Sequence, residues 1–417
     1  MEIETIAEKI KQAGGNIYLV GGSLRDKLLG KPIHDEDYCV TGLSKEEFET
    51  LFPESISRGK VFQVYDMAGK EFALARKERK IQIGHTGFEI ETGKEISIQE
   101  DLRRRDITIN AMAQEVLTKE IIDPYHGQAD LEKRCIRAVG TSFIEDPLRV
   151  YRVARFAASL QFTVEEKTIQ YMKMLKSELS SLSPERVFVE FRKALATKKP
   201  SIFFEVLRKA EVLEVHFKEI YDLIGSLQPV KYHPEGDSYQ HTLQVVDNSV
   251  FLTEDLPTRF ACLVHDLGKG ITPKEMQPHH YGHDEKGVSL VGNLAKRLVI
   301  PNRWTKCGKV AAKYHMKGGI FEKMTPAKQV DFITNIQKSA LGLEGMKIVV
   351  LCDKKREGEF PKTIYFVEMG KACLSQVTGK SVMEKYQLEP AEGLKERIRQ
   401  ERIAWVKNNQ EKFRQKT

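Results

Sequence analysis

The chain has 417 residues, of which 41% are hydrophobic and 30% charged, with a formal net charge of +7 and a pI of about 8.8. It contains no run of about 18 apolar residues, which excludes a membrane-spanning helix, and the polar start MEIETIAEKI is not expected to be a signal peptide. Its six cysteines form no Cys-x-x-Cys pair, which argues against a disulfide framework and predicts a reduced, cytoplasmic protein. The length predicts about two to four domains, and the modest positive charge permits nucleic-acid binding without requiring it.

The first 142 residues alternate short strand-like runs with helical patterns, which predicts an α/β (α+β) head. NIYLV and DYCV predict strands, and LRDKLL between them predicts a helix. SKEEFETLF predicts a helix with Ser44 as N-cap and Glu47 in capping-box spacing. FQVYDM and KEFALAR predict a hairpin that turns near Ala68-Gly69, and DITINAMAQEV and CIRAV predict further strands.

Beyond about residue 143 the apolar positions recur with the period of a helix. The clearest runs are EDPLRVYRVARFAASL, TIQYMKMLKSEL, PERVFVEFRKAL and FFEVLRKAEVL. Because residues 226–239 are rich in Pro, Gly and polar side chains, they are the best candidate boundary. We expect an all-α middle followed by all-α C-terminal regions with a basic tail, and we place the domains at 1–142, 143–228, 229–345 and 346–417.

Two features of the head indicate phosphate and metal binding. Gly21-Gly22 lies where a strand meets a helix, so the backbone and the helix N-terminus can approach a phosphate, and Arg25 follows in the first turns. Asp35 and Asp37 stand two apart on a strand-like segment, which predicts that they share a face and hold Mg²⁺. Glu71 could complete the carboxylate set. A plain turn and a solvated surface remain the alternatives at this point.

These residues form part of an ordered series of motifs that resembles the bacterial tRNA nucleotidyltransferases, or CCA-adding enzymes, of the polymerase-β-like superfamily. The series covers roughly residues 16–220 and consists of GGSLRDKLLGKPIHDED, RRD at 104–106 with Thr108 and Asn110, DPYHG at 123–127, EDPLRVYRVARF at 145–156 and SPERVFVEF at 183–191. The resemblance implies Mg²⁺-dependent transfer of CMP and AMP to a tRNA 3′ end. It also implies contact with the tRNA acceptor arm and a monomer or homodimer.

The resemblance assigns roles within these motifs. Asp146 and Arg149, taken to share one face of a helix, would pair with the incoming base, because cytosine and adenine both place an amino donor beside a ring-nitrogen acceptor. Arg105, Arg152 and Arg155 would clamp the triphosphate. Asp106 and Asn110 join the nucleotide-binding set by motif position. The segment between Arg76 and Glu100, which is basic at its start and carries Gly84, Gly87 and Gly93, is expected to be a mobile loop that favours addition of A.

A second constellation lies in the C-terminal half, where seven of the eleven histidines fall between His233 and His315. ACLVHDLGKG contains the His265-Asp266 pair, and the arrangement resembles an HD-type metal-dependent phosphohydrolase. By that resemblance the core ligands are His241, His265, Asp266 and Asp353, while His280, His283 and His315 could serve a second ion or a phosphate. The ion would be Ni, Mn, Fe or Co, or Mg²⁺. Where relatives can carry another His-Asp pair, this chain has His315-Met316, which would weaken the hydrolase or limit it to one metal.

Four functions remain open on the sequence. The first is a full CCA-adding enzyme using CTP and ATP, with a 2′,3′-cyclic phosphodiesterase or phosphatase in its HD domain. The second is an A-adding enzyme or a poly(A) polymerase. The third is an HD phosphohydrolase with an inactive, RNA-binding head, and the fourth is a non-catalytic RNA-binding protein.

Overall fold

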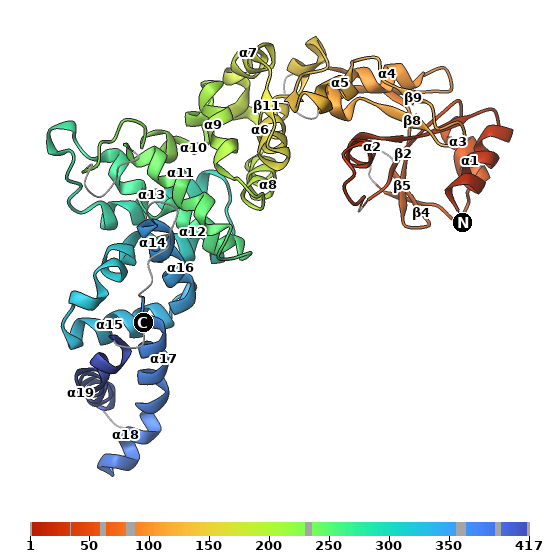
Figure 1. The fold of residues 1–417 in the computed structure, drawn as a ribbon. Helices are drawn as coiled ribbons and strands as arrows, with labels where there is room; N and C mark the ends of the chain where they lie inside the picture. The colour runs from red at the N-terminus through yellow and green to blue at the C-terminus, as the bar shows by residue number, and fades with distance from the viewer. Residues whose placement is uncertain are drawn as a thin grey trace. The chain divides into compact units, whose positions relative to one another are not determined.

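A computed structural model describes residues 2–33, 35–58, 64–80, 88–229, 236–355, 364–387 and 393–414 (Figure 1). These residues divide into two compact units. The first consists of residues 1–186 and 205–212, and the second of 187–204 and 213–417. The four domain ranges predicted from the sequence stay a prediction. The described part of the chain has no helix long and apolar enough to cross a membrane.

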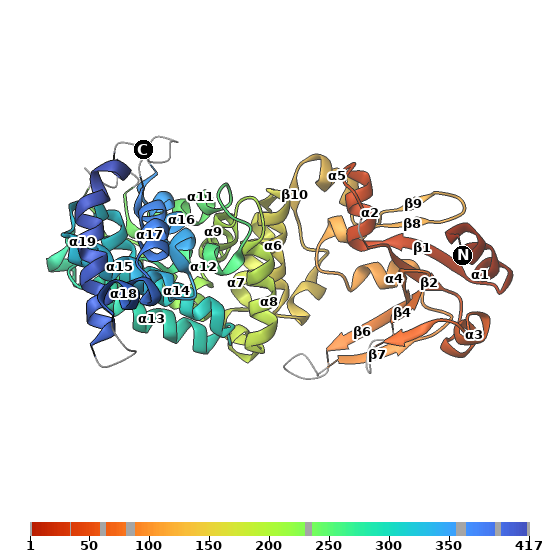
Figure 2. The same ribbon diagram turned by 90° about the horizontal axis from the view of Figure 1, so that it is seen from below.

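The first unit is built on a mixed sheet, as predicted. Among the described residues the sheet has the strand order β3-β4-β5-β2-β1-β8-β9, and β2 and β5 are its parallel pair. Its strands are β1 (Asn16–Val20), β2 (Asp37–Thr41), β3 (Ile56–Arg58), β4 (Val64–Met67), β5 (Lys70–Leu74), β8 (Ala113–Glu115) and β9 (Ile121–Ile122). The helices of this part are α1 (Ile3–Gln12), α2 (Gly21–Leu28), α3 (Lys45–Leu51), α4 (Ile98–Arg103) and α5 (Gly127–Glu132). A two-stranded ladder joins β6 (Arg76–Lys80) to β7 (Phe88–Thr92) (Figure 2). A second ladder joins β10 (Cys135–Ile136) to β11 (Thr163–Val164).

Local sequence signals account for several of these elements. The Ser44 hydroxyl accepts from the Glu47 amide at 3.3 Å, and the Glu47 side chain accepts from the Ser44 amide at 2.9 Å, which confirms the predicted capping box on α3. β4 and β5 form the predicted hairpin, and both turn residues, Ala68 and Gly69, have positive φ, as a tight hairpin turn requires. The strand run proposed to begin at Phe62 includes residues 62 and 63, which lie outside the described residues.

Three predictions about elements of the head were wrong. DITINAMAQEV is not one strand, because Thr108–Asn110 forms a 3-10 helix and only β8 is extended. CIRAV contributes only the two residues of β10. The described part of the segment between Arg76 and Glu100 is largely β6, β7 and the start of α4 rather than a loop, and residues 81–87, which include Gly84 and Gly87, lie outside the described residues.

The remaining chain is helical, as predicted. After the 3-10 turn η2 (Thr141–Glu145), the helices are α6 (Arg149–Leu160), α7 (Glu166–Met174), α8 (Pro184–Leu195), α9 (Ser201–Lys209), α10 (Leu213–Tyr221), α11 (Ser238–Ser249), α12 (Leu256–Val264), α13 (His283–Arg297), α14 (Asn302–Gly319), α15 (Pro326–Gln337), α16 (Gly342–Lys354), α17 (Phe366–Gln376), α18 (Gly379–Tyr386) and α19 (Leu394–Arg414). Short 3-10 turns lie between some of them: η3 (Lys176–Ser181), η4 (Leu267–Ile271), η5 (Lys274–Met276) and η6 (Phe321–Lys323). In the second unit, α11, α12, α14 and α16 share one apolar core, to which Val245, Cys262, Ala311 and Val349 contribute buried side chains.

Candidate functional site

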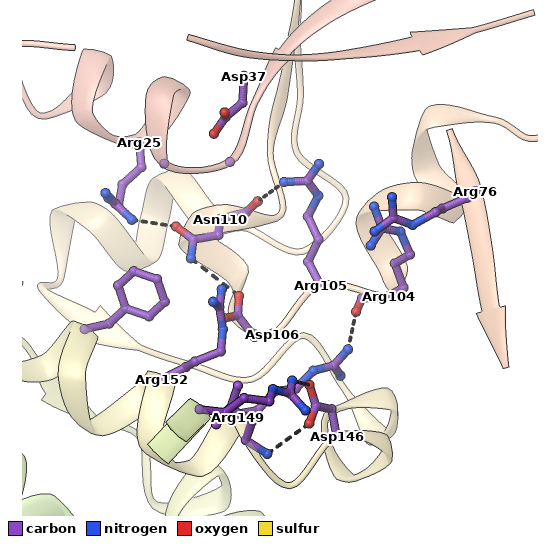
Figure 3. Close-up of a pocket in the computed structure, with 15 residues that line it drawn as sticks. Arg25, Asp37, Arg76, Arg104, Arg105, Asp106, Asn110, Asp146, Arg149 and Arg152 are labelled. Carbon is purple, nitrogen blue, oxygen red and sulfur yellow. Dashed lines mark hydrogen bonds and ion pairs between the residues drawn. The ribbon is translucent and has the colours of Figure 1, made fainter. Parts of the chain in front are cut away.

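A cavity of about 490 Å³ in the first unit collects most of the residues predicted to bind a nucleotide (Figure 3). Its lining residues are Gly21, Gly22, Arg25, Asp37, Arg76, Arg104, Arg105, Asp106, Asn110, Asp146, Leu148, Arg149, Arg152, Phe156 and Arg186. This volume lies within the range of about 300–1,000 Å³ that is usual for small-molecule sites. Seven arginines against three aspartates make the cavity strongly basic, which suits a polyanion such as a triphosphate.

One wall of the cavity is the glycine-led start of α2. Gly21 has φ +66°, a backbone conformation that favours glycine, and the missing Cβ leaves room for the Arg105 guanidinium, whose Nη1 would lie 3.0 Å from it. Arg25, which is 8% exposed, donates from Nη1 to Asn110 Oδ1 at 2.8 Å. Gly21, Gly22 and Arg25 therefore form one wall of the cavity, where Asn110 holds Arg25 in place, and phosphate binding at this wall stays a prediction.

The predicted catalytic carboxylates lie beside this wall. Asp37 is the first residue of β2, and the parallel ladder aligns it with Glu71 on β5. Burial raises the pKa of Asp37, and the negative charges of Glu71 and Asp35 raise it further. A divalent cation would offset the repulsion between these neighbouring carboxylates, and carboxylate oxygens are the ligands that Mg²⁺ prefers. The residues therefore fit a metal such as Mg²⁺.

The reason given for the Asp35–Asp37 pairing was wrong in one respect. Asp35 lies in an exposed bend before β2, so strand alternation does not set its direction. Instead Ser23 of α2 connects the two residues, because its hydroxyl donates to the Asp35 carbonyl at 2.8 Å and accepts from the Asp37 amide at 3.1 Å. Glu36 between them contacts Lys70 and accepts from the Tyr38 hydroxyl at 3.2 Å. Among the described residues, the carboxylates of the head are not among the groups of three or more ligand atoms that converge within 4.8 Å.

Buried acids hold the arginines of the opposite wall. Asp106 Oδ2 accepts from Arg152 Nε at 2.7 Å, and Asp101 accepts from both Arg104 and Arg105. Burial by itself raises the pKa of Asp106, but the charge and hydrogen bond of Arg152, together with the charge of Arg149, outweigh it and hold the pKa below its ordinary value. The guanidinium groups are thus fixed in the cavity before any ligand binds.

The predicted base-reading residues both line the cavity. Asp146 was expected on a helix with Arg149, but it has extended backbone and precedes α6, whose first residue is Arg149. The Asp146 carboxylate accepts from the Leu148 amide at 3.0 Å and lies 3.6 Å from Arg186. Arg149 is 7% exposed, and its guanidinium donates to the carbonyl oxygens of Ser142 and Arg104.

Five cavity residues have no role predicted from the sequence: Arg76, Arg104, Leu148, Phe156 and Arg186. All but Arg76 stand within the motifs quoted above. Of the residues predicted to act in the head, Asp35, Glu71 and Arg155 are not among those that line the cavity. The guanidinium of Arg155, predicted to clamp the triphosphate, lies 3.8 Å from the centre of the Phe156 ring, which packs as a cation–π contact.

A separate cluster in the second unit brings together the predicted metal ligands. His241 Nε2 lies 3.0 Å from Asp353 Oδ1, and His265 Nε2 lies 3.2 Å from Asp266 Oδ2 and 3.8 Å from Asp353 Oδ1. His283 Nε2 and His315 Nε2 approach Asp266 Oδ1 at 3.3 and 3.2 Å. Within the described chain, His241–His265–Asp353 and His265–Asp266–His315 each converge within 4.8 Å, as metal ligands would.

The histidine rings are oriented for metal binding. Nδ1 of His265 lies 2.8 Å from the Cys262 carbonyl, Nδ1 of His315 lies 3.0 Å from the Ala311 carbonyl, and Nδ1 of His283 also contacts a carbonyl. These contacts place the ring proton on Nδ1 and leave the Nε2 lone pair facing the cluster. His265 Nε2 is buried and makes no hydrogen bond, an arrangement that a divalent cation would satisfy.

Two expectations about this cluster need correction. His280 is not available as a ligand, because its Nδ1 lies 2.9 Å from the Thr272 hydroxyl and its Nε2 lies 2.8 Å from the Leu227 carbonyl. Met316 is 48% exposed, whereas His315 is 1% exposed, so a carboxylate at position 316 would lie on the surface rather than in the cluster. His233 lies outside the described residues.

Lys269 belongs to this site although the sequence analysis did not assign it. It is 7% exposed, and its Nζ lies 2.5 Å from Asp266 Oδ2. Burial raises the pKa of Asp266, but the charge of Lys269 together with the histidine contacts reverses this effect and holds the pKa well below the ordinary value. The signal was present in HDLGK, where the lysine follows the aspartate by three residues.

Comparison with known proteins finds family models that match both the head and the HD region. Sequence profiles match the poly A polymerase head domain at residues 17–137, a probable RNA- and SrmB-binding site of polymerase A at 161–223, and the HD domain at 238–330. A multifunctional CCA protein of Psychromonas ingrahamii is 40% identical over 374 residues, which are 88% of this chain and 86% of that protein.

Solved structures share the fold. The CCA-adding enzyme of Bacillus stearothermophilus, in complex with CTP, aligns with a TM-score of 0.64 at 21% identity over 100% of this chain and 98% of that one. The Thermotoga maritima CCA-adding enzyme, complexed with tRNA, aligns with a TM-score of 0.64 at 16% identity, covering 96% of this chain and 89% of that one.

Proposed function

This chain belongs to the family of multifunctional CCA proteins, and from that premise we propose that it adds C, C and A to the 3′ end of tRNA, using CTP and ATP and releasing pyrophosphate. The observation that carries the proposal is the cavity of the first unit. It combines Asp37, which the sheet aligns with Glu71 on the neighbouring strand, a basic wall for a triphosphate, and the Asp146–Arg149 pair. A plain RNA-binding surface would need only the positive charge.

The proposed reaction joins the tRNA 3′ oxygen to the α-phosphorus of the nucleotide. The bond between the α- and β-phosphates breaks, pyrophosphate leaves, and the hydroxyl proton is released. Asp35 and Asp37, with Glu71 beside them, would hold Mg²⁺, which when bound lowers the pKa of the attacking hydroxyl and neutralises phosphate charge. Arg105 and Arg152 would contact the phosphates, and the acids that fix them keep the wall ready for the triphosphate.

Asp146 and Arg149 would select the base. A carboxylate accepts from the amino group of cytosine or adenine, and a guanidinium donates to the adjacent ring nitrogen. Guanine and uracil place a carbonyl beside a ring N–H, so they would leave the donor and the acceptor of the protein unpaired. This pattern supports use of both CTP and ATP by one pair of side chains.

The test uses the full chain with Mg²⁺, CTP, ATP and three tRNA transcripts that end before CCA, after C and after CC. Sequencing of the 3′ ends should show completion of all three. Extension of the CC-ended transcript alone, by one A, would replace the proposal with an A-adding enzyme. Runs of A on any RNA would indicate a poly(A) polymerase, and no extension at all would leave an HD hydrolase with an RNA-binding head.

We also propose a metal-dependent phosphohydrolase activity for the HD cluster, with 2′,3′-cyclic phosphates and phosphate monoesters as substrates. The buried Nε2 of His265, which makes no hydrogen bond, and the convergence of six candidate ligand side chains favour this activity. Hydrolysis of 2′,3′-cyclic AMP should require an added divalent metal. Asp266→Asn should abolish hydrolysis while CCA addition continues, and persistence of hydrolysis in this variant would refute the assignment.

A further inference from the structure

A buried lysine, Lys269, contacts the HD cluster, and a bound divalent cation would leave the cluster and this lysine with a net positive charge. Lys269 Nζ lies 2.5 Å from Asp266 Oδ2, and the same carboxylate lies within 3.7 Å of four histidines. With neutral histidines, Lys269, Asp266 and Asp353 sum to one negative charge. A bound divalent cation would turn this sum into one positive charge and would compete with Lys269 for the Asp266 carboxylate. A buried cation without a counter-charge is costly, so the loaded site should take up an anion beside Lys269.

A second buried side chain lies beside Lys269 and has a free donor. Gln228 is 4% exposed, and its Oε1 accepts from Lys269 Nζ at 2.6 Å. Its Nε2 is buried and makes no hydrogen bond within the described chain. Since buried amide N–H groups are nearly always paired, this donor indicates a missing acceptor.

The backbone around Gln228 is held in place. The neighbouring Leu227 donates its amide to Gln277 Oε1 at 2.9 Å, and its carbonyl lies 2.8 Å from His280 Nε2. The Ser226 hydroxyl donates to the Lys269 carbonyl at 3.0 Å. This gives His280 a different role from the one first expected: it supports the segment that carries Gln228 and does not bind metal.

We propose that Lys269 and Gln228 form an anion-binding corner of the HD centre, which takes a phosphoryl oxygen of the substrate. Gln228 Nε2 and the remaining N–H groups of Lys269 supply the donors, and the metal-bearing Asp266 fixes the corner next to the reacting phosphate. The proposal rests on the phosphohydrolase function proposed above, and it restricts the substrates of that site to phosphate esters rather than neutral compounds.

Calorimetry on the full chain loaded with Mn²⁺ and titrated with inorganic phosphate tests the corner directly. Lys269→Met should weaken phosphate binding at least tenfold and leave the Mn²⁺ affinity unchanged or higher, because the lysine competes with metal for Asp266. Gln228→Leu should show a smaller loss of phosphate binding, and Lys269→Arg should restore part of it. Lys274→Met, which changes an exposed lysine five residues further along, is the matched control and should bind both ions normally.

Kinetics with 2′,3′-cyclic AMP separate this inference from the proposed activity. If the wild type hydrolyses the ester and Lys269→Met raises KM at least tenfold, both stand. If the wild type binds phosphate through Lys269 but hydrolyses nothing, the corner stands and the hydrolase fails. Normal phosphate binding by Lys269→Met, or loss of its Mn²⁺ binding, would overturn the corner. The corner would also be overturned if Lys269→Met weakened the binding of inorganic phosphate but left the KM for 2′,3′-cyclic AMP unchanged.

Discussion

Replacing Arg149 with alanine tests whether side chains select the incoming base. The guanidinium is almost fully buried and donates to two carbonyl oxygens, those of Arg104 and Ser142. Hydrogen bonds to charged groups contribute about 1.5–3 kcal/mol each, and some of this returns when water reaches the carbonyls, so the free energy of unfolding should fall by about 2–4 kcal/mol. Separately, loss of the donor to the ring nitrogen should cost about 1–3 kcal/mol of discrimination, or about 5- to 150-fold in selectivity for CTP over UTP.

The assay is single-turnover incorporation of CMP and UMP into a tRNA that ends before CCA. It is run at a temperature where circular dichroism shows the variant folded, so that lost stability does not enter the ratio. Arg152→Ala on the same helix is the comparison, because a phosphate contact should slow CTP and UTP alike. An unchanged CTP-to-UTP ratio in folded Arg149→Ala would refute selection by protein side chains.

Three other predictions follow from single contacts. Asp37→Asn removes the carboxylate that lies opposite Glu71 and should reduce CCA addition at least a thousandfold while hydrolysis by the HD centre continues. A rate of CCA addition by Asp37→Asn close to that of the wild type would disprove the head metal site. A Cβ at Gly268 would lie 1.9 Å from the His283 carbonyl oxygen, so Gly268→Ala should displace the start of α13 and abolish Mn²⁺ binding at the HD cluster, measured by calorimetry, but not CCA addition. Burial, with a smaller contribution from the charge of Arg297, lowers the pKa of His216 from 6.5 to about 4. As the pH falls, this histidine is therefore protonated in the unfolded chain before it is protonated in the folded one. The free energy of unfolding should fall by up to about 3 kcal/mol as the pH drops from 6.5 to 4. Urea unfolding of His216→Phe at both pH values should lack that loss, and an equal loss would exclude His216 as its source.

The parts of the fold that local physics determines were predictable from the sequence. The Ser44 capping box and the hairpin turn at Ala68-Gly69 depend on neighbours within a few residues, and both form as expected. The segment from Asp106 to Val116 was misassigned because its apolar residues are buried by tertiary packing around a 3-10 turn rather than by strand alternation. Such packing leaves no periodic signal in a single sequence.

The candidate sites divide in the same way. Motif order was enough to collect Asp37 and Arg105 in one cavity and His265 and Asp266 in one cluster. The partners that hold these residues could not be found in this way, since Ser23 reaches Asp37 across 14 positions and Gln228 reaches Lys269 across 41. Such contacts join residues that are distant in the sequence and depend on the tertiary fold, which the pattern of residues in a single sequence does not reveal.

We predict that the two sites differ in how they bind a divalent cation. In the head, Asp35 and Glu71 are exposed, so Mg²⁺ affinity should depend on the oxygens that a bound triphosphate adds. In the HD cluster the Nδ1 contacts of His265 and His315 preset the ligands, so a metal should bind without substrate. Equilibrium dialysis should therefore show Mn²⁺ bound at the HD cluster in the absence of nucleotide, and a further Mg²⁺ retained only when CTP or ATP is present. Retention of Mg²⁺ by the head without nucleotide would show that its carboxylates are more constrained than their exposure indicates.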